Sequence, residues 1–311
     1  MENDPLLERV LADGLLGDGP VLVMLSGGRD SVCMLDLAAR SRSPREVLAL
    51  HVNYGLRDDA DADERFCAQL CDSLDVELSV RRPVRPDGAG NLQAWARDVR
   101  YDAAARIALP LQARIVTGHT ADDQVETILY RLASSPSRRA LLGMKPSDGV
   151  LARPLLGTTR TEVTEYCERR GLVWREDASN GEPTFARNRI RAGLLPELAE
   201  VHPAAAANVL RTAAILRDEA EVLDALVAAE LDGSGAERRG TIRQARLREL
   251  HPSLRRLVVQ QLADAAAGRP VPGAARFAEQ VAELRHGGAM LDLGGGVRAV
   301  LEHGVIRAER P

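Results

Sequence analysis

Short runs of aliphatic residues in the first part of the chain predict the strands of a sheet. Residues 21–25 form an unbroken apolar pentapeptide, and similar short stretches occupy residues 47–52, 76–80 and 114–117. Their length and branched content are typical of strands buried on both faces. Helical patterns fill the intervals, at residues 32–40, 58–73 and 91–108. This alternation predicts an α/β fold with a Rossmann-like parallel sheet.

The pattern changes near residue 201. Long alanine-rich and amphipathic helical segments follow, and residues 290–301 with 304–307 predict a small terminal β-hairpin. We therefore predict two domains, an α/β domain over residues 1–200 and a mainly helical domain over residues 201–311.

The charge of the chain is small overall but locally concentrated. The 311 residues carry a formal net charge of −4, so a nucleic-acid partner would have to bind at local basic patches. Residues 238–256 form the most basic stretch, with Glu249 as the only acid among seven arginines. Contact with an RNA backbone and a plain charged helix surface are equally compatible with this stretch.

The cysteines and the termini narrow the class of protein. None of the four cysteines forms a Cys-x-x-Cys pair, which predicts buried, reduced thiols. The N-terminus lacks the pattern of a signal peptide, and no apolar stretch approaches the roughly 18 residues of a membrane span. We therefore expect a soluble cytoplasmic protein without membrane contacts.

A glycine turn follows the first predicted strand. It consists of Ser26, Gly27, Gly28, Arg29, Asp30 and Ser31, and a predicted helix begins directly after it. Glycines allow a sharp turn and a close ligand approach, and the free N–H groups at a helix start attract anions. The turn lacks the lysine of a Walker A loop and the spacing of dinucleotide-binding glycines. It therefore predicts an anion site of another kind, or else an ordinary Gly-Gly turn.

Polar residues follow the second and fourth predicted strands. His51 lies near the end of one strand, and His119, Asp123 and Glu126 follow the other, where a helix begins. Open α/β sheets bind ligands at the carboxyl ends of their strands. Positions 123 and 126 share one side of the helix, so the carboxylates with the imidazole could bind Mg²⁺, an ammonium group or both. The alternatives are a helix-stabilising acidic first turn and, at His51, a satisfied polar side chain.

Residues 187–191 concentrate positive charge. Arg187, Arg189 and Arg191 alternate with Asn188 and Ile190. Guanidinium groups bind phosphates and carboxylates through two parallel hydrogen bonds. Arg187, Asn188 and Arg191 are therefore candidates for positioning a substrate, and a solvated basic face is the alternative.

Taken together, these segments resemble the tRNA(Ile)-lysidine synthetase family of PP-loop (N-type) ATP pyrophosphatases. The matching segments lie at residues 26–31, 51–57, 96–101, 118–127, 153–156, 177–180 and 187–191. The chain departs from the family at Tyr54, where the family has a histidine, and at residues 134–140, where the glycines of an Arg-Gly-Ser-Gly segment are missing. It stops before the last domain of longer members and so resembles the short form.

The resemblance implies a reaction. Its members use ATP, with Mg²⁺, to join free lysine to C2 of the wobble cytidine in the CAU anticodon of an isoleucine tRNA. The cytidine is first adenylated with loss of pyrophosphate, and the lysine amine then displaces AMP to give lysidine. By the same resemblance, residues 1–200 are the PP-loop catalytic domain and residues 201–311 a tRNA-binding domain.

The resemblance also implies roles for individual residues. The glycine turn, with His51, binds ATP, and Asp30 binds Mg²⁺. Asp123 and Glu126 bind the lysine ammonium group, and they or His119 accept its proton, so that Asp30 and these three residues form the catalytic set. Further contacts to lysine or tRNA are assigned to Arg187, Asn188 and Arg191.

Two other hypotheses remain open at this point. A tRNA thiolation enzyme of the same superfamily would generally need paired Cys-x-x-Cys residues, which this chain lacks. A non-enzymatic adenine-nucleotide-binding module would not need Asp123, Glu126 and the arginines together. The oligomeric state, with a homodimer as one arrangement, and the catalytic base do not follow from the sequence.

Overall fold

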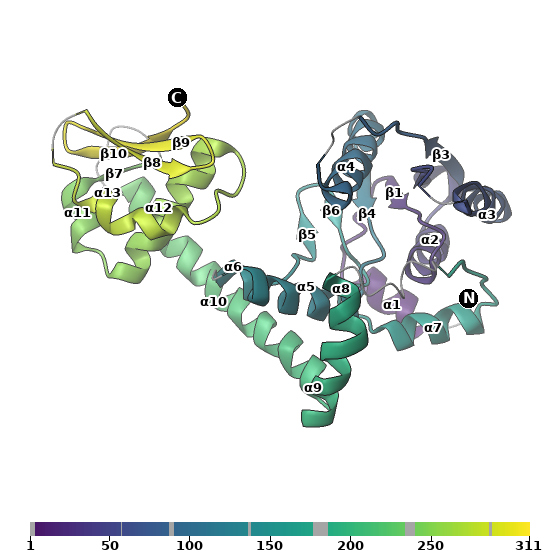
Figure 1. The fold of residues 1–311 in the computed structure, drawn as a ribbon. Coiled ribbons are helices and arrows are strands. Elements are labelled where there is room, and N and C mark those ends of the chain that lie inside the picture. Colours follow the sequence, from purple (N-terminus) through teal and green to yellow (C-terminus); the bar gives the residue numbers. More distant parts are fainter. Residues whose placement is uncertain are drawn as a thin grey trace. The chain divides into compact units, whose positions relative to one another are not determined.

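The computed structural model describes residues 4–56, 58–86, 90–135, 138–176, 186–233, 240–285 and 288–311. The chain divides into two compact units, Met1–Thr212 and Ala213–Pro311 (Figure 1). Each unit has a hydrophobic core of its own. The division lies about a dozen residues after the change of pattern near residue 201, within helix α10 (Ala205–Gly233).

The first unit is built around a six-stranded sheet in the order β3-β2-β1-β4-β6-β5 (Figure 1). The strands are β1 (Val21–Met24), β2 (Val47–Val52), β3 (Glu77–Arg81), β4 (Arg114–Val116), β5 (Ser147–Asp148) and β6 (Leu151–Ala152). All neighbouring pairs are parallel except β5 and β6. The four predicted strands are confirmed. Strands β5 and β6 were not predicted, because two residues are too few to give a periodic pattern.

Helices cover both faces of this sheet. The helices of the unit are α1 (Pro5–Ala12), α2 (Arg29–Ser41), α3 (Ala60–Ser73), α4 (Leu92–Leu111), α5 (Ala121–Ser134), α6 (Arg138–Leu141), α7 (Arg160–Arg169), α8 (Ala186–Arg189) and α9 (Leu195–Val201), with short turns of other helix types at Pro44–Glu46 and Ile190–Leu194. Side-chain caps fix where two of the important helices begin. Asn91 accepts from the N–H groups of Gln93 and Ala94 at the start of α4, and Thr120 forms a capping box with Asp123 at the start of α5.

Strand β1 lies at the centre of the unit and is buried on both faces. Val21 and Val23 point into a core shared with α1, α2, α3 and α7. Leu22 and Met24 point the other way, into a core built with the alanines of α4. This explains why the strand reads as a continuous apolar run rather than an alternating one. All four cysteines are buried and free, as predicted.

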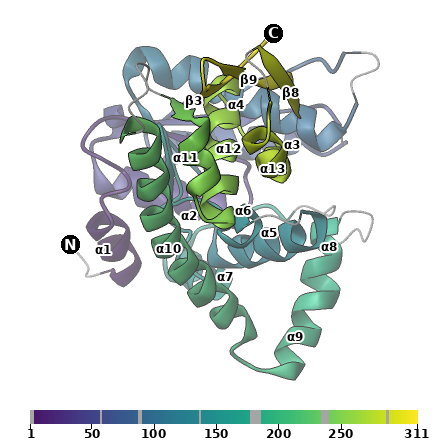
Figure 2. The same ribbon diagram turned by 90° about the vertical axis from the view of Figure 1, so that its left-hand side faces the viewer.

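The second unit combines helices with a four-stranded antiparallel sheet in the order β7-β10-β9-β8. Its elements after α10 are β7 (Thr241–Arg243), α11 (Gln244–Glu249), α12 (Pro252–Ala267), a short turn at Ala274–Phe277, α13 (Ala278–Ala282), β8 (Ala289–Gly294), β9 (Val297–Glu302) and β10 (Val305–Glu309). Helix α12 packs against β9 and β10 (Figure 2). The predicted hairpin is therefore part of a larger sheet. Its fourth strand, β7, comes from the basic stretch, where Ile242 is the one apolar residue in the strand and gave too weak a pattern to predict it.

Among the described residues, no helix combines the length and the apolar character that crossing a bilayer would require.

Candidate active site at the carboxyl edge of the sheet

The carboxyl ends of the central strands meet at one edge of the sheet. Val23 of β1 is level with Ala49 of β2 on one side and with Val116 of β4 on the other. The glycine turn follows β1, and residues 117–119 follow β4, so the register brings the two segments to the same edge. The sequence placed both candidate segments after strands, and the sheet order makes them neighbours.

Hydrogen bonds from its own serines stabilise the glycine turn. Ser31 Oγ donates to the carbonyl oxygen of Gly28 at 2.8 Å and accepts from the N–H of Ser26 at 3.1 Å. Gly27 has a φ of 85°, and a Cβ there would lie 3.3 Å from Cys67 Sγ, so the position needs glycine. Helix α2 begins immediately afterwards, with Gly28 at its N-cap. The turn therefore presents the start of a long helix to the sheet edge, which is the geometry of an anion site.

A segment far along the chain clamps this turn. The N–H of Arg175 donates to the carbonyl oxygen of Gly27 at 2.9 Å, and Arg175 Nε donates to Asp63 of α3 at 2.9 Å. The turn is thus fixed from outside by a backbone bond and an ion pair. Sequence reasoning assigned no role to either residue, because their contact spans 112 positions.

Gly118 allows β4 and α2 to approach closely. A Cβ at this position would lie 2.4 Å from the carbonyl oxygen of Asp30 and 3.0 Å from the N–H nitrogen of Ser31. No side chain fits at the first distance without a backbone shift. The glycine therefore sets the spacing between the glycine turn and the residues after β4.

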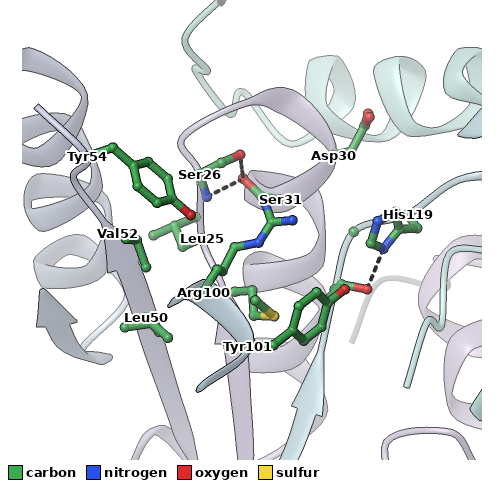
Figure 3. A pocket seen from close by; sticks show the side chains of 13 residues that line it. Leu25, Ser26, Asp30, Ser31, Leu50, Val52, Tyr54, Arg100, Tyr101 and His119 are labelled. Atoms are coloured by element: carbon green, nitrogen blue, oxygen red, sulfur yellow. Dashed lines mark hydrogen bonds between the residues drawn. The ribbon is translucent and has the colours of Figure 1, made fainter. Parts of the chain in front are cut away.

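A cavity of about 220 Å³ lies between these segments (Figure 3). Asp30 and Ser31 line one side, His119 lines another, and Tyr54 and Tyr101 contribute their rings. The Tyr101 hydroxyl is buried without a hydrogen-bond partner in the part of the chain that the structure describes. Because typical ligand pockets measure roughly 300–1,000 Å³, the cavity suits a ring-sized part of a larger ligand.

The acid pair, Asp123 and Glu126 on α5, already has cationic partners. Glu126, with 2% of its side chain exposed, accepts two hydrogen bonds from Arg191, at 2.7 Å from Nε and 3.1 Å from Nη2. Arg160 Nη2 lies 3.5 Å from Glu126 and 3.7 Å from Asp123. Asp123 Oδ2 accepts a hydrogen bond from the N–H of Thr120, and the Asp123 side chain remains 24% exposed. The two acids therefore differ, because Glu126 is buried and paired and Asp123 is reachable.

His119 stands at the cavity wall as a neutral imidazole. Its Nδ1 lies 2.7 Å from Thr117 Oγ1 (Figure 3). Burial lowers the pKa of His119 to about 4, because Arg153 and Arg100 add to the burial effect and outweigh the opposing Asp123 carboxylate. At neutral pH this ring is therefore uncharged and only weakly basic.

Asp30 faces the same edge from the start of α2. Burial raises the pKa of Asp30, the Asp123 carboxylate raises it further, and the salt-bridged Arg29 opposes both. A cation beside Asp30 would relieve this unfavourable carboxylate. No group of three or more His, Cys, Asp or Glu residues arranged to hold a metal occurs among the described residues. Asp30 thus fits Mg²⁺ only in the manner of sites where one or two carboxylates act together with substrate phosphates and water.

The other predicted site residues lie in different surroundings. His51 is 5% exposed and sits behind the cavity, where its Nδ1 donates to the carbonyl oxygen of Leu25 at 3.0 Å. Arg187 is exposed on α8, which contacts α5, and Asn188 is half-buried on the same helix. Residues 177–180 of the resembling segments, Arg57, and residues 136 and 137 of the loop at 134–140 lie outside the described residues.

Comparisons with known proteins identify the family of the first unit. A family model described as a PP-loop domain matches residues 5–198. The chain is 36% identical to the tRNA(Ile)-lysidine synthase of Azoarcus sp. (strain BH72), over 84% of this chain and 59% of that protein. It is 33% identical to the tRNA(Ile)-lysidine synthase of Thermus thermophilus, over 87% of this chain and 53% of that protein. The chain thus spans between half and two thirds of the length of these curated relatives.

A solved structure shares the fold. It is a U34-tRNA thiolase from Methanococcus maripaludis, with a TM-score of 0.57 and 18% sequence identity, covering 68% of this chain and 78% of that one. At this identity the likeness concerns the fold alone. The match over residues 5–198 accounts for more than half of the sequence, and the glycine turn, the parallel sheet and the acidic start of α5 all lie within it. The chain belongs to the PP-loop domain family.

Proposed function

We propose that this protein ligates free lysine to C2 of the wobble cytidine in a CAU-anticodon isoleucine tRNA at the expense of ATP. The observation that carries the proposal is the shared cavity, which joins the glycine turn to His119. The acid pair does not line this cavity, but the Asp123 carboxylate acts electrostatically on both His119 and Asp30, which do. The names of the curated relatives support this substrate class. The proposal requires an anion site and a cation site on two sides of one base, and the geometry supports both.

The first step is adenylation of the base. The C2 carbonyl oxygen of cytidine attacks the α-phosphorus of ATP, the bond to the β-phosphate oxygen breaks, and pyrophosphate leaves. The N–H groups at the start of α2 and the hydroxyls of Ser26 and Ser31 stabilise the charge that develops on the phosphates. Because Gly27 and Gly118 fix this turn rigidly, its donors are already oriented for that charge.

Asp30 is the residue that would hold Mg²⁺. When bound there, the ion would neutralise phosphate charge. The raised pKa of Asp30 supports this assignment, because the carboxylate remains unfavourable despite its salt bridge to Arg29 and would gain from a second cation. Asp30 is also a wall of the cavity, so a cation at this carboxylate would lie beside the transferred group.

The second step is attack by the lysine amine on C2, with cleavage of the bond from C2 to the adenylated oxygen and release of AMP. Asp123 is the acid that receives the incoming ammonium group, because its side chain is exposed enough to be reached. Glu126 pairs with Arg191 and Arg160, and it thereby positions these two guanidinium groups beside Asp123. The amine must lose a proton before it attacks. With its pKa lowered to about 4, His119 is as weak a base as an ordinary carboxylate, so we assign proton removal to His119, a carboxylate or solvent.

The cysteines favour this reaction over thiolation. All four are buried in the core of the first unit. Burial raises the pKa of the Cys67 and Cys71 thiols to about 12, which suppresses the thiolate form that sulfur chemistry needs.

The test is incorporation of radiolabelled lysine into an isoleucine tRNA transcript with a CAU anticodon. The matched control is the same transcript with a GAU anticodon, which has no cytidine at the wobble position. We expect ATP-dependent labelling of the first transcript only, with one AMP released per lysine. ATP consumption without lysine incorporation, or labelling of both transcripts, would refute the proposal.

A further inference from the structure

Four arginines from four elements gather beside the cavity in the first unit. They are Arg97 on α4, Arg131 on α5, Arg153 directly after β6 and Arg187 on α8, and we call them the arginine cluster. Arg97 and Arg153 act electrostatically on both His119 and Arg131, so the cluster extends from the cavity wall to α5. Helix α8 contacts α5, which brings Arg187 to the same side.

No carboxylate neutralises this cluster in the described part of the chain. Arg131 Nη1 donates to the carbonyl oxygen of Gly143 at 2.6 Å, and Arg153 Nη1 donates to that of Lys145 at 2.6 Å. Arg97 lies over the ring of Tyr101, with its guanidinium carbon 4.6 Å from the centroid. Arg153 is 5% exposed, and its Nε is a buried donor without a partner. Among the described residues, neutral carbonyls and a ring therefore compensate for several full charges.

The mutual repulsion of these arginines is evident at Arg131. Burial lowers the pKa of Arg131, and the neighbouring Arg187, Arg97 and Arg153 lower it further. A protein holds like charges together in this way at a cost that an anion would remove. The buried carboxylate of Glu126 is not available for this purpose, because it is already paired with Arg191 and Arg160.

We propose that the arginine cluster binds a backbone phosphate of the RNA strand whose target base enters the cavity. This inference rests on the proposed function. The triphosphate of ATP is assigned to the glycine turn. Arg97 of the cluster lies over the ring of Tyr101, which lines the cavity, so the strand flanking a base bound there would pass close to the cluster. Guanidinium groups suit phosphodiesters because they donate paired hydrogen bonds to two oxygens.

Salt-dependent RNA binding tests the proposal. The probe is a fluorescent RNA stem-loop with a CAU anticodon loop, and its dissociation constant is measured by anisotropy over a series of salt concentrations. Arg131→Gln and Arg97→Gln are compared with Arg106→Gln, which removes the same charge from an exposed position further along α4. Each cluster variant should weaken binding by about tenfold or more and lower the slope of log Kd against log salt by about 0.7–1. The Arg106 variant should match wild type.

Two results would overturn the proposal. Slopes for the cluster variants equal to that of Arg106→Gln would mean that no phosphate is bound there. A raised KM for ATP with unchanged RNA binding would assign the cluster to the nucleotide instead. Thermal unfolding of each variant, together with KM for ATP, excludes a folding defect as the cause of weaker RNA binding.

The outcome is separable from that for the proposed function. If wild type binds the stem-loop but incorporates no lysine, the ligase proposal fails and the slopes still report a phosphate contact. If wild type makes lysidine and the slopes do not change, the ligase proposal stands and the arginine cluster has another role.

Discussion

The arginines of the two units serve different purposes. In the second unit the basic stretch pairs internally, since Arg246 bonds Glu230 at 2.7 Å, and Arg248 lies 3.5 Å from Glu283. In the first unit the arginine cluster has no described carboxylate partner. Local arginine density in the sequence therefore does not locate positive potential. In the described part of the dense stretch, Arg246, Arg248 and Arg255 pair with acids from other segments, whereas the scattered arginines of the cluster have no carboxylate partner among the described residues.

The same contrast teaches where stability and chemistry are placed. Charges that are fully paired hold elements together, as Arg255 does by bonding three carbonyl oxygens around the turn between α11 and α12. Charges at the sheet edge are left unfavourable, as with Asp30 and Arg131. Functional sites often show this arrangement. We therefore expect substitutions of charged residues at the candidate site in the first unit to lower activity, and substitutions of paired arginines in the second unit to lower stability.

The largest effect is expected from Asp30→Asn. Loss of the carboxylate should slow pyrophosphate release by about 100- to 1,000-fold, the range seen when one transition-state contact is removed. Because the folded state raises the pKa of Asp30, the ionised carboxyl destabilises the fold at neutral pH. The variant should therefore melt at the wild-type temperature or above it, and tRNA binding should be unchanged. A lower melting temperature with equal loss of tRNA binding would make Asp30 a structural residue.

The next effect comes from Gly118→Ala. The new Cβ would clash with the carbonyl oxygen of Asp30 and push α2 away from β4. Overpacking of this kind costs about 1–3 kcal/mol, and the displaced glycine turn should bind ATP poorly. The matched control is Gly157→Ala, where an added Cβ meets nothing within 4 Å. Chemical denaturation and KM for ATP measure both, and equal behaviour of the two variants would remove the role given to Gly118.

Arg255→Gln should affect only stability. The side chain is 13% exposed and pairs with Glu279 in addition to its carbonyl contacts. Its loss should lower the free energy of unfolding by about 2 kcal/mol and leave the salt dependence of RNA binding unchanged. This is the opposite of the pattern expected for Arg131→Gln. An RNA-binding slope that falls for Arg255→Gln would erase the distinction between the units.

An effect on the free energy of unfolding that is absent at neutral pH is expected at His119. Its folded pKa of about 4 lies below the unfolded value of about 6.5, so the unfolded state binds the proton first as the pH falls. Stability contributed by neutral His119 is complete above pH 6.5 and is lost between about pH 6.5 and 4. The variant His119→Gln should lose about 2.5 kcal/mol less than wild type across that window. Identical denaturation curves for the two proteins at each pH would contradict the lowered pKa.

Most of the first unit could be predicted from the sequence. Buried parallel strands give continuous apolar runs, and a parallel register then forces their carboxyl ends to one edge, so the glycine turn and the start of α5 had to meet. Helix starts were equally readable, because Asn91 and Thr120 cap through side chains that lie within three residues. Local chemistry of this kind is encoded locally.

Contacts between distant segments could not be predicted in the same way. Arg175 clamps the glycine turn, and Arg191 occupies Glu126, through pairings 148 and 65 positions apart, which no spacing rule reports. The difference between an exposed Asp123 and a buried Glu126 also depends on what packs over α5. The fourth strand of the second sheet was missed because three residues with one apolar side chain carry almost no hydrophobic pattern.

Asp30 at the glycine turn and Asp123 on α5 should be needed at different steps, and a single-turnover experiment tests this most directly. Wild type, Asp30→Asn and Asp123→Asn are mixed with ATP, the CAU transcript and lysine, and release of pyrophosphate and of AMP is followed separately. Asp30→Asn should block both products, whereas Asp123→Asn should release pyrophosphate at close to the wild-type rate and accumulate adenylated tRNA without releasing AMP. Equal loss of pyrophosphate release in both variants would contradict the assignment of phosphate transfer to Asp30 and of amine binding to Asp123.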